Sequence, residues 1–184
     1  HVLSRRQRQM CIRDSSTSVS KTNEMVAALK KELAFRKGEA QEPIETIYFG
    51  GGTPSLLTAS QINLLIAEVY AQFSVVTLPE ITLEANPEDL TPAYLKALKE
   101  VGINRLSIGI QSFHDKELTF MNRVHNGKQA VQAVVWAKEL FDNISIDLLF
   151  GTPHTTFADW QENLEIALKL DVPHISSCLL YTSD

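Results

Sequence analysis

Three consecutive glycines follow a short hydrophobic segment and could form a binding site for a small ligand. Ile44–Phe49 is rich in β-branched and aromatic residues, as is typical of a buried strand, and Gly50–Gly52, Thr53 and Pro54 follow it directly. Glycine has no Cβ atom, so its backbone can adopt positive φ and approach a ligand closely. Exposed backbone N–H groups after a strand form ligand sites at the carboxyl edge of α/β sheets. The same glycines could instead make only a tight turn.

The glycine run lacks the patterns of two common nucleotide-binding loops. No Gly-Lys-Ser/Thr sequence ends it, so the lysine that a P-loop directs at phosphates is missing. The spacing G-x-G-x-x-G of a dinucleotide site is also absent. We therefore predict neither a P-loop nor a dinucleotide fingerprint here.

In each of three later predicted strands, a polar residue lies on the face opposite the apolar residues. These polar residues are Glu84 in Ile81–Glu84, Gln111 in Arg105–Gln111 and Asp147 in Ile144–Phe150. Because successive side chains of a strand point to opposite faces, each strand has one apolar and one polar face. A dry core would make the polar faces costly, so we expect a wet cavity that binds a polar ligand. Each residue could also be a satisfied structural group.

Predicted strands and helices alternate along the chain, which indicates parallel strands joined by helical crossovers. Beyond the strands above, we predict a strand beginning at Val172–Ser176 and helices at 20–37, 58–73, 91–102, 115–121, 128–141 and 156–170. A doubly wound sheet would have strands that are apolar on both faces. An ordinary closed barrel would be filled with Val, Ile and Leu. The polar faces therefore predict an α/β fold in the form of a partial (β/α) TIM-like barrel with parallel strands, incomplete at both ends.

Composition excludes several classes of protein. The chain has 184 residues, 44% of them hydrophobic, which suits one globular domain or a large piece of one. Its net charge of −5 gives no reason to expect nucleic acid as a partner. No apolar run reaches the roughly 18 residues needed to span a membrane. The two cysteines, Cys11 and Cys178, form neither a disulfide framework nor a metal site, so we expect a cytoplasmic protein.

Both ends of the chain are unlike the rest. Residues 1–15 are rich in arginine and have no helical or strand periodicity, and residues 178–184 interrupt a strand-like run. Both strings resemble translated sequencing-adaptor tails. We predict that 1–15 and 178–184 are non-native and poorly anchored, and that 16–177 forms the core of the domain.

Five motifs in order resemble one family. I-Y-F-G-G-G-T-P, L-E-A-N-P-E, L-S-I-G-I-Q-S-F, N-R-V-H and I-D-L-L-F-G-T-P are similar to radical S-adenosylmethionine (radical SAM) proteins of the oxygen-independent coproporphyrinogen III oxidase group. The N-R-V-H-N run is more similar to the HemW-type branch, described as heme chaperones. The resemblance covers nearly all of 16–177 and implies a radical SAM barrel.

The resemblance implies roles for seven residues and none for a catalytic or metal-ligating side chain. It implies that the amino-acid end of S-adenosylmethionine binds at Gly51, Gly52 and Thr53, and that Glu84 accepts hydrogen bonds from the ribose. In the oxidase branch, the positions that match Gln111, Arg123 and Asp147 contact a second S-adenosylmethionine. Arg123 could instead be solvated or salt-bridged. We assign no role to His125 and expect it at the surface.

The family also binds a [4Fe–4S] cluster through a Cys-x3-Cys-x2-Cys loop, and this chain has no such loop. Cys11 stands alone where that loop is expected, so we predict that the chain as given is inactive. The resemblance implies porphyrinogen or heme as partner and an electron donor such as flavodoxin or ferredoxin.

Three functions stay open at this point. One is oxidative decarboxylation of coproporphyrinogen III in heme and porphyrin biosynthesis, by a protein of the HemW-like branch. A second is delivery of heme by a chaperone without oxidase activity. The third is binding of another small ligand by a cluster-free α/β barrel.

Overall fold

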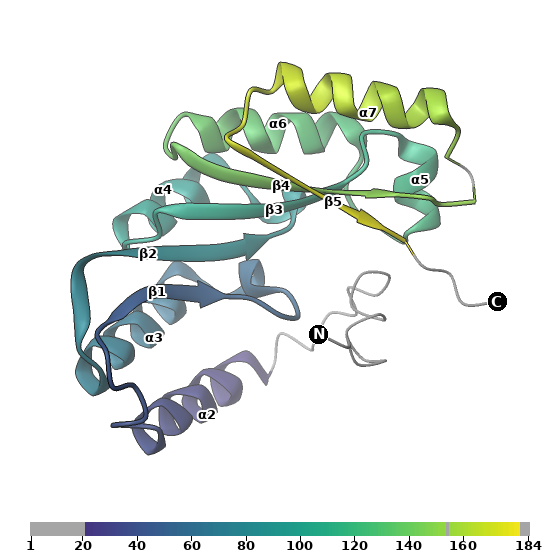
Figure 1. Cartoon of the computed structure of the whole chain (residues 1–184). Helices are drawn as coiled ribbons and strands as arrows, with labels where there is room; N and C mark the ends of the chain where they lie inside the picture. Colours follow the sequence, from purple (N-terminus) through teal and green to yellow (C-terminus); the bar gives the residue numbers. More distant parts are fainter. Residues whose placement is uncertain (1–20, 154, 181–184) are drawn as a thin grey trace.

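The protein is a curved sheet of five parallel strands with helices on one side, as seen in a computed structural model (Figure 1). The structure describes residues 21–153 and 155–180. The strands, in spatial and sequence order, are β1 (Ile44–Phe49), β2 (Val75–Ala85), β3 (Arg105–Gln111), β4 (Asn143–Phe150) and β5 (His174–Leu179). Each neighbouring pair is parallel. The predicted partial barrel is confirmed.

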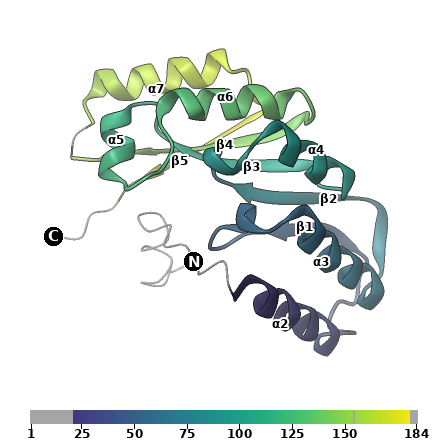
Figure 2. The same ribbon diagram turned by 180° about the vertical axis from the view of Figure 1, so that it is seen from behind.

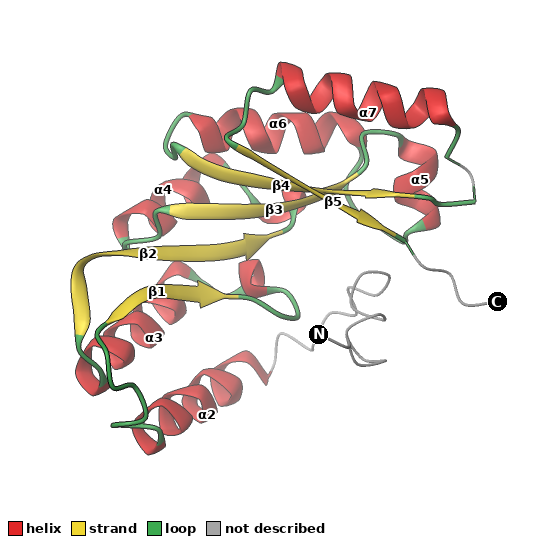
Figure 3. Ribbon diagram, viewed as in Figure 1, coloured by secondary structure: helices red, strands yellow, loops and turns green. Residues whose placement is uncertain are grey.

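Helices connect the strands (Figure 3). They are α2 (Thr22–Phe35), α3 (Ala59–Gln72), α4 (Pro92–Glu100), α5 (Asp115–Phe120), α6 (Gly127–Lys138) and α7 (Phe157–Lys169), with short 3-10 turns η2 (Pro54–Leu56) and η3 (Pro87–Asp89). Side-chain caps fix the start of several helices. Thr58 and Gln61 form a capping box at the start of α3, and Thr91 caps α4, with Pro92 as its first residue.

The two faces of the sheet differ in polarity, as predicted from the alternation. Leu83, Leu106 and Ile146 are fully buried on the face that the helices cover. Their sequence neighbours Glu84 and Ser107 are register partners, so these two side chains lie on the opposite face. In Figures 1 and 2 helices α3, α4, α6 and α7 lie along one side of the curved sheet. The polar residues therefore line the inner face of a half-barrel.

Strand β5 continues beyond the predicted limit. Cys178 pairs with Leu149 and Leu179 with Phe150, and the N–H group of Leu180 donates to the carbonyl of Phe150 over 2.8 Å. The expectation that the chain is poorly anchored from Cys178 onward is therefore wrong for residues 178–180. Backbone hydrogen bonds of a ladder do not depend on side-chain identity, so unusual composition did not reveal the pairing. Residues 1–15 and 181–184 lie outside the described residues, and the non-native origin of both tails stays a prediction.

Helix α2 lies within the predicted range 20–37. Met25, Leu29 and Leu33 form an apolar stripe along the helix, whereas Val26 is its one buried residue. Met25 and Leu29 are exposed, and the stripe lines a groove of about 780 Å³ between α2, β1 and α3. The periodicity correctly predicted the helix, and its apolar stripe faces the groove.

Candidate functional site

The glycine loop requires glycine at three successive positions. Gly51 and Gly52 have φ of 80° and 68°, in the left-handed region that side chains disfavour. At Gly50, an added Cβ would lie 2.6 Å from a ring carbon of Tyr48 and 3.0 Å from Oε1 of Glu84. The loop is therefore more than a turn, because Gly50 leaves room for two side chains of the inner face.

Glu84 joins this loop to the sheet. Its Oε1 accepts a hydrogen bond from the Tyr48 hydroxyl over 2.8 Å, and its Oε2 accepts one from the Gly51 N–H over 3.0 Å. Burial and the neighbouring Glu84 carboxylate raise the pKa of Tyr48 to about 12, so Tyr48 remains a donor at neutral pH. Sequence reasoning placed Glu84 and Gly51 in one site and missed Tyr48. The alternation of side chains along the strands could have identified Tyr48. Tyr48 pairs in register with Thr82, two residues before Glu84, so Tyr48 and Glu84 lie on the same face of the sheet.

Asp147 lies on the same inner face, in β4. The Ser107 hydroxyl donates to its Oδ2 over 3.3 Å. Burial raises the pKa of Asp147, and the negative charge of Glu84 raises it further, while the hydrogen bond from Ser107 opposes the shift. Two carboxyl groups thus share one region of the half-barrel, and the charged form of Asp147 is disfavoured there.

Gln111 and Arg123 meet above a further glycine of β3. An added Cβ at Gly109 would lie 2.9 Å from Nε2 of Gln111 and 3.3 Å from Nη2 of Arg123. Arg123 also donates from Nη1 to Oδ1 of Asn86 over 3.3 Å. Arg123 is therefore not a solvated surface residue but lies against the inner face beside Gln111.

Gln111 reaches this position through an irregular backbone. Its φ is 67°, and the β3–β4 register shifts between Ile108 and Gln111. The side chain folds back over Gly109 from this turn. Simple alternation predicted the correct face without showing the turn.

His125 contradicts the expectation of a surface histidine. Its side chain is fully buried, with Nδ1 2.9 Å from Oε2 of Glu88 and Nε2 3.0 Å from the Ile110 carbonyl. The residues on either side of His125 are exposed, so the local sequence gives no signal that His125 is buried. Its burial depends on the hydrogen bond to Glu88, which is distant in the sequence.

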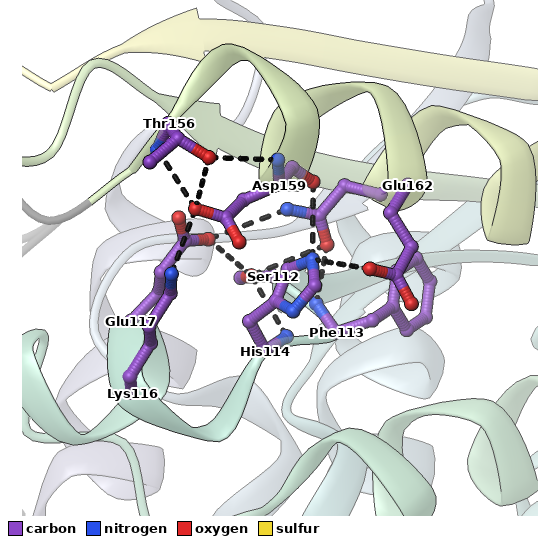
Figure 4. A network of polar contacts seen from close by, with 9 residues as sticks. Ser112, Phe113, His114, Lys116, Glu117, Thr156, Asp159 and Glu162 are labelled. Atoms are coloured by element: carbon purple, nitrogen blue, oxygen red, sulfur yellow. Dashed lines mark hydrogen bonds and ion pairs between the residues drawn. The ribbon is translucent and has the colours of Figure 1, made fainter.

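A buried polar network holds the loop that follows Gln111 (Figure 4). Glu117 is completely buried, and its Oε2 accepts hydrogen bonds from the Ser112 hydroxyl and, over 3.3 Å, from Nδ2 of Asn163 in α7. Asn163 also accepts the Phe113 N–H over 2.7 Å. Sequence reasoning missed these residues, because their partners lie far apart in the sequence.

A second part of this network is exposed. Lys116 of α5 and Asp159 of α7 form an ion pair of 2.7 Å (Figure 4). The hydrogen bond from Lys116, with two from Thr156, holds the pKa of Asp159 well below its usual value. Helices α5 and α7 are thereby joined at the carboxyl end of the sheet.

The cysteines do not fit an iron–sulfur cluster. Such a cluster needs three closely spaced protein thiolates, and the whole chain has two cysteines. Cys178 is exposed on β5, and Cys11 lies outside the described residues. Within 21–153 and 155–180 no three His, Cys, Asp or Glu residues are grouped to hold a metal ion. Nor is any helix in those ranges long and apolar enough to cross a bilayer.

Comparisons with known proteins agree with the sequence motifs. Residues 9–167 match the family model described as the radical SAM superfamily, so the match begins inside the segment predicted to be non-native. A Bacillus subtilis protein named heme chaperone HemW is 38% identical over 157 residues, which cover 84% of this chain and 41% of that protein. A Synechocystis protein of the same name is 37% identical over 154 residues, covering 83% of this chain and 37% of that protein.

Solved structures support the same relationship. Coproporphyrinogen III oxidase (HemN) from Escherichia coli, described as a radical SAM enzyme, aligns with a TM-score of 0.83 and 26% identity. The alignment covers 90% of this chain and 39% of that one. HydG, a hydrogenase maturase, aligns with a TM-score of 0.61 at 17% identity and shares the fold. The chain thus spans about two fifths of the length of the HemW and HemN proteins, and the predicted resemblance to their group is confirmed.

Proposed function

Because the chain belongs to the radical SAM superfamily, we propose that the inner face of its half-barrel binds S-adenosylmethionine. In this proposal Gly51–Thr53 bind the amino-acid end of the cofactor and Glu84 binds its ribose. The observation that carries the proposal is the contact of Glu84 with the Gly51 N–H, which joins the two predicted parts of the site.

The donors and acceptors of these residues suit the two ends of the cofactor. Carbonyl and N–H groups of a glycine loop can bind an ammonium and a carboxylate at close range. A carboxylate has about four lone-pair positions, and Glu84 uses two of them for Tyr48 and Gly51. Two positions therefore remain for the hydroxyl hydrogens of a ribose.

Gln111, Arg123 and Asp147 extend the proposed site along β3 and β4. The guanidinium of Arg123 can bind a carboxylate through two parallel hydrogen bonds. The carboxylate of a second S-adenosylmethionine or a propionate of a porphyrin offers that group. We propose that these three residues bind such a second ligand.

No reaction step through an iron–sulfur cluster is proposed for this chain. When bound, such a cluster supplies the electron that cleaves S-adenosylmethionine, but two cysteines cannot provide its three thiolate ligands. The proposal for these residues is therefore cofactor binding.

For the complete protein we propose a role in handling heme. The similar sequences from Bacillus subtilis and Synechocystis are named heme chaperone HemW, and they are 38% and 37% identical to this chain. Oxidative decarboxylation of coproporphyrinogen III is the second candidate, favoured by the structural similarity to HemN at 26% identity. Hemin titration and a decarboxylation assay on the complete protein distinguish them. Stoichiometric hemin binding without decarboxylation is expected, and decarboxylation of coproporphyrinogen III would overturn the chaperone role.

Calorimetric titration with S-adenosylmethionine tests the proposed site in this chain. Glu84→Ala should weaken binding by about 1–3 kcal/mol, the scale for hydrogen bonds to a charged group. Glu100→Ala is the matched control, because Glu100 is exposed at the end of α4 in the outer helical layer. Equal affinities for the two variants would remove Glu84 from the site.

A further inference from the structure

His125 lies between the carboxyl group of Glu88 and the carbonyl group of Ile110. When Glu88 is ionised, both groups accept hydrogen bonds and neither can donate one. The Nδ1 atom of His125 is 2.9 Å from Oε2 of Glu88, and its Nε2 is 3.0 Å from the carbonyl oxygen of Ile110. The side chain of His125 has no exposed surface, so water cannot replace either partner. A neutral imidazole has one N–H group, which would leave the other nitrogen facing an acceptor without a proton. An imidazolium satisfies both partners.

Glu88 favours the ionised form of this pair. Burial disfavours its carboxylate, but the hydrogen bond from His125 and one from its own backbone hold its pKa below the usual value. Arg123, on the same loop as His125, adds a second positive charge nearby and lowers the pKa of Glu88 further. Glu88 is the charged group that the ring contacts, Arg123 is a positive charge near Glu88, and β3 contributes the neutral carbonyl of Ile110.

The second hydrogen bond of the ring stabilises the turn at Gln111. The Ile110 carbonyl also accepts the N–H of Ser112 over 2.9 Å, which closes a three-residue turn around Gln111. With φ of 67° at its centre, this turn is of the rare γ type that is strained for residues with a side chain. Such a conformation persists only where its surroundings fix it, and His125 donates to the carbonyl on which the turn closes.

The contact between His125 and Glu88 also fixes the position of Arg123. Glu88 lies in η3, and Asn86, the residue directly before η3, accepts the hydrogen bond from Nη1 of Arg123. His125 follows Arg123 by two residues, so its bond to Glu88 fixes the loop of Arg123 against η3. Gln111 and Arg123 then meet over Gly109.

We propose that His125, as an imidazolium held by Glu88, is a positioning residue that fixes the side chains of Gln111 and Arg123 on the inner face. Its consequence for ligand binding rests on the proposed function. The charge of the ring and the position of Gln111 are properties of the chain without ligand, so they can be measured even if the chain binds no S-adenosylmethionine.

Nitrogen-15 NMR of the imidazole rings at neutral pH tests the charge directly in the unmodified chain. The signals of His125, assigned by their loss in His125→Gln, should be those of a ring protonated on both nitrogens. In Glu88→Gln the ring should lose this signature, because an amide can donate to Nδ1. A neutral tautomer in the unmodified chain would overturn the proposal.

The side-chain amide signal of Gln111 tests the positioning. It should move to the position of a solvated glutamine in His125→Gln and stay unchanged in the control His174→Gln, whose histidine is exposed at the start of β5. An unchanged Gln111 signal in a folded His125→Gln variant would overturn the proposal. If that variant does not fold, Glu88→Gln, which retains the ring, replaces it in the same comparison.

Binding completes the test. Both Gln111→Ala and His125→Gln should weaken binding of S-adenosylmethionine, by roughly tenfold each, the factor for one lost hydrogen bond to a charged group. The double variant should bind no more weakly than His125→Gln alone, because loss of His125 already removes the contact that Gln111 makes. Additive losses would contradict positioning. Absence of binding to the unmodified chain would refute the proposed function, and the Gln111 signal would still decide the role of His125.

Discussion

Replacing Gly109 with alanine should separate binding from folding. Gly109 is not in the left-handed region, so alanine fits its backbone, but the new Cβ would lie 2.9 Å from Nε2 of Gln111 and 3.3 Å from Nη2 of Arg123. Both atoms are at the ends of long side chains, which can move without the backbone. We therefore expect a folded protein in which Gln111 and Arg123 are displaced from the inner face.

The change in stability should be small. Exchange of glycine for alanine at a compatible position stabilises by about 0.4–1 kcal/mol through the unfolded state. Loss of the Arg123–Asn86 hydrogen bond of 3.3 Å costs about 0.5–1.5 kcal/mol. The two effects nearly cancel, so the melting temperature should change by no more than about 4 °C. Loss of one charge-assisted contact should weaken ligand binding by about 1.5–3 kcal/mol.

Thermal unfolding and calorimetric titration measure the two quantities on the same sample. Gly127→Ala is the matched control for steric conflict, because a Cβ there would collide with the backbone carbonyl of Phe113, which cannot move freely. That variant should be strongly destabilised. If Gly109→Ala unfolds like Gly127→Ala, the argument that Gln111 and Arg123 can move without the backbone is refuted. If it folds and binds S-adenosylmethionine as tightly as the unmodified chain, the assignment of Gln111 and Arg123 to the site is refuted.

Three further predictions concern the acidic residue of β4, the buried network and the cluster. Burial and Glu84 raise the pKa of Asp147 above its unfolded value, so the charged form of Asp147 costs stability at neutral pH, and this cost vanishes as the pH falls below about 4. Asp147→Asn should therefore raise the melting temperature at neutral pH and not in acid. A difference in melting temperature that does not depend on pH would contradict this. Asn163→Ala leaves the Phe113 N–H unpaired and removes a donor to Glu117, so denaturant unfolding should show a loss of about 2–4 kcal/mol, whereas Gln161→Ala on the exposed face of α7 should change little. Anaerobic reconstitution with iron and sulfide should give no [4Fe–4S] absorbance. Addition of reductant and S-adenosylmethionine should then give no 5′-deoxyadenosine. A stoichiometric cluster would show that our interpretation of the first fifteen residues is wrong.

The sequence predicted the parts of the site that follow from regular alternation. Glu84 and Asp147 lie on the inner face because strands have a period of two, and the glycine loop follows a strand whose end is visible in the composition. Gln111 lies on that face through a γ-turn, which alternation cannot show.

Long-range partners account for the misses. His125 is buried because Glu88, 37 residues away, and the Ile110 carbonyl satisfy its ring. Tyr48 belongs to the site because its hydroxyl reaches Glu84, 36 residues later. The apolar stripe of α2 lines a groove, because periodicity shows that a face is apolar and not that another element covers it.

Chemical-shift mapping with S-adenosylmethionine tests the central claim most directly. Titration of the nitrogen-15-labelled chain should shift the backbone signals of Glu84, Ser107 and Asp147, which belong to the inner face. The signals of Leu29 and Leu33, which line the groove beside α2, should not move. Shifts confined to Leu29 and Leu33, with Glu84 and Asp147 unchanged, would place the ligand outside the half-barrel and contradict the account.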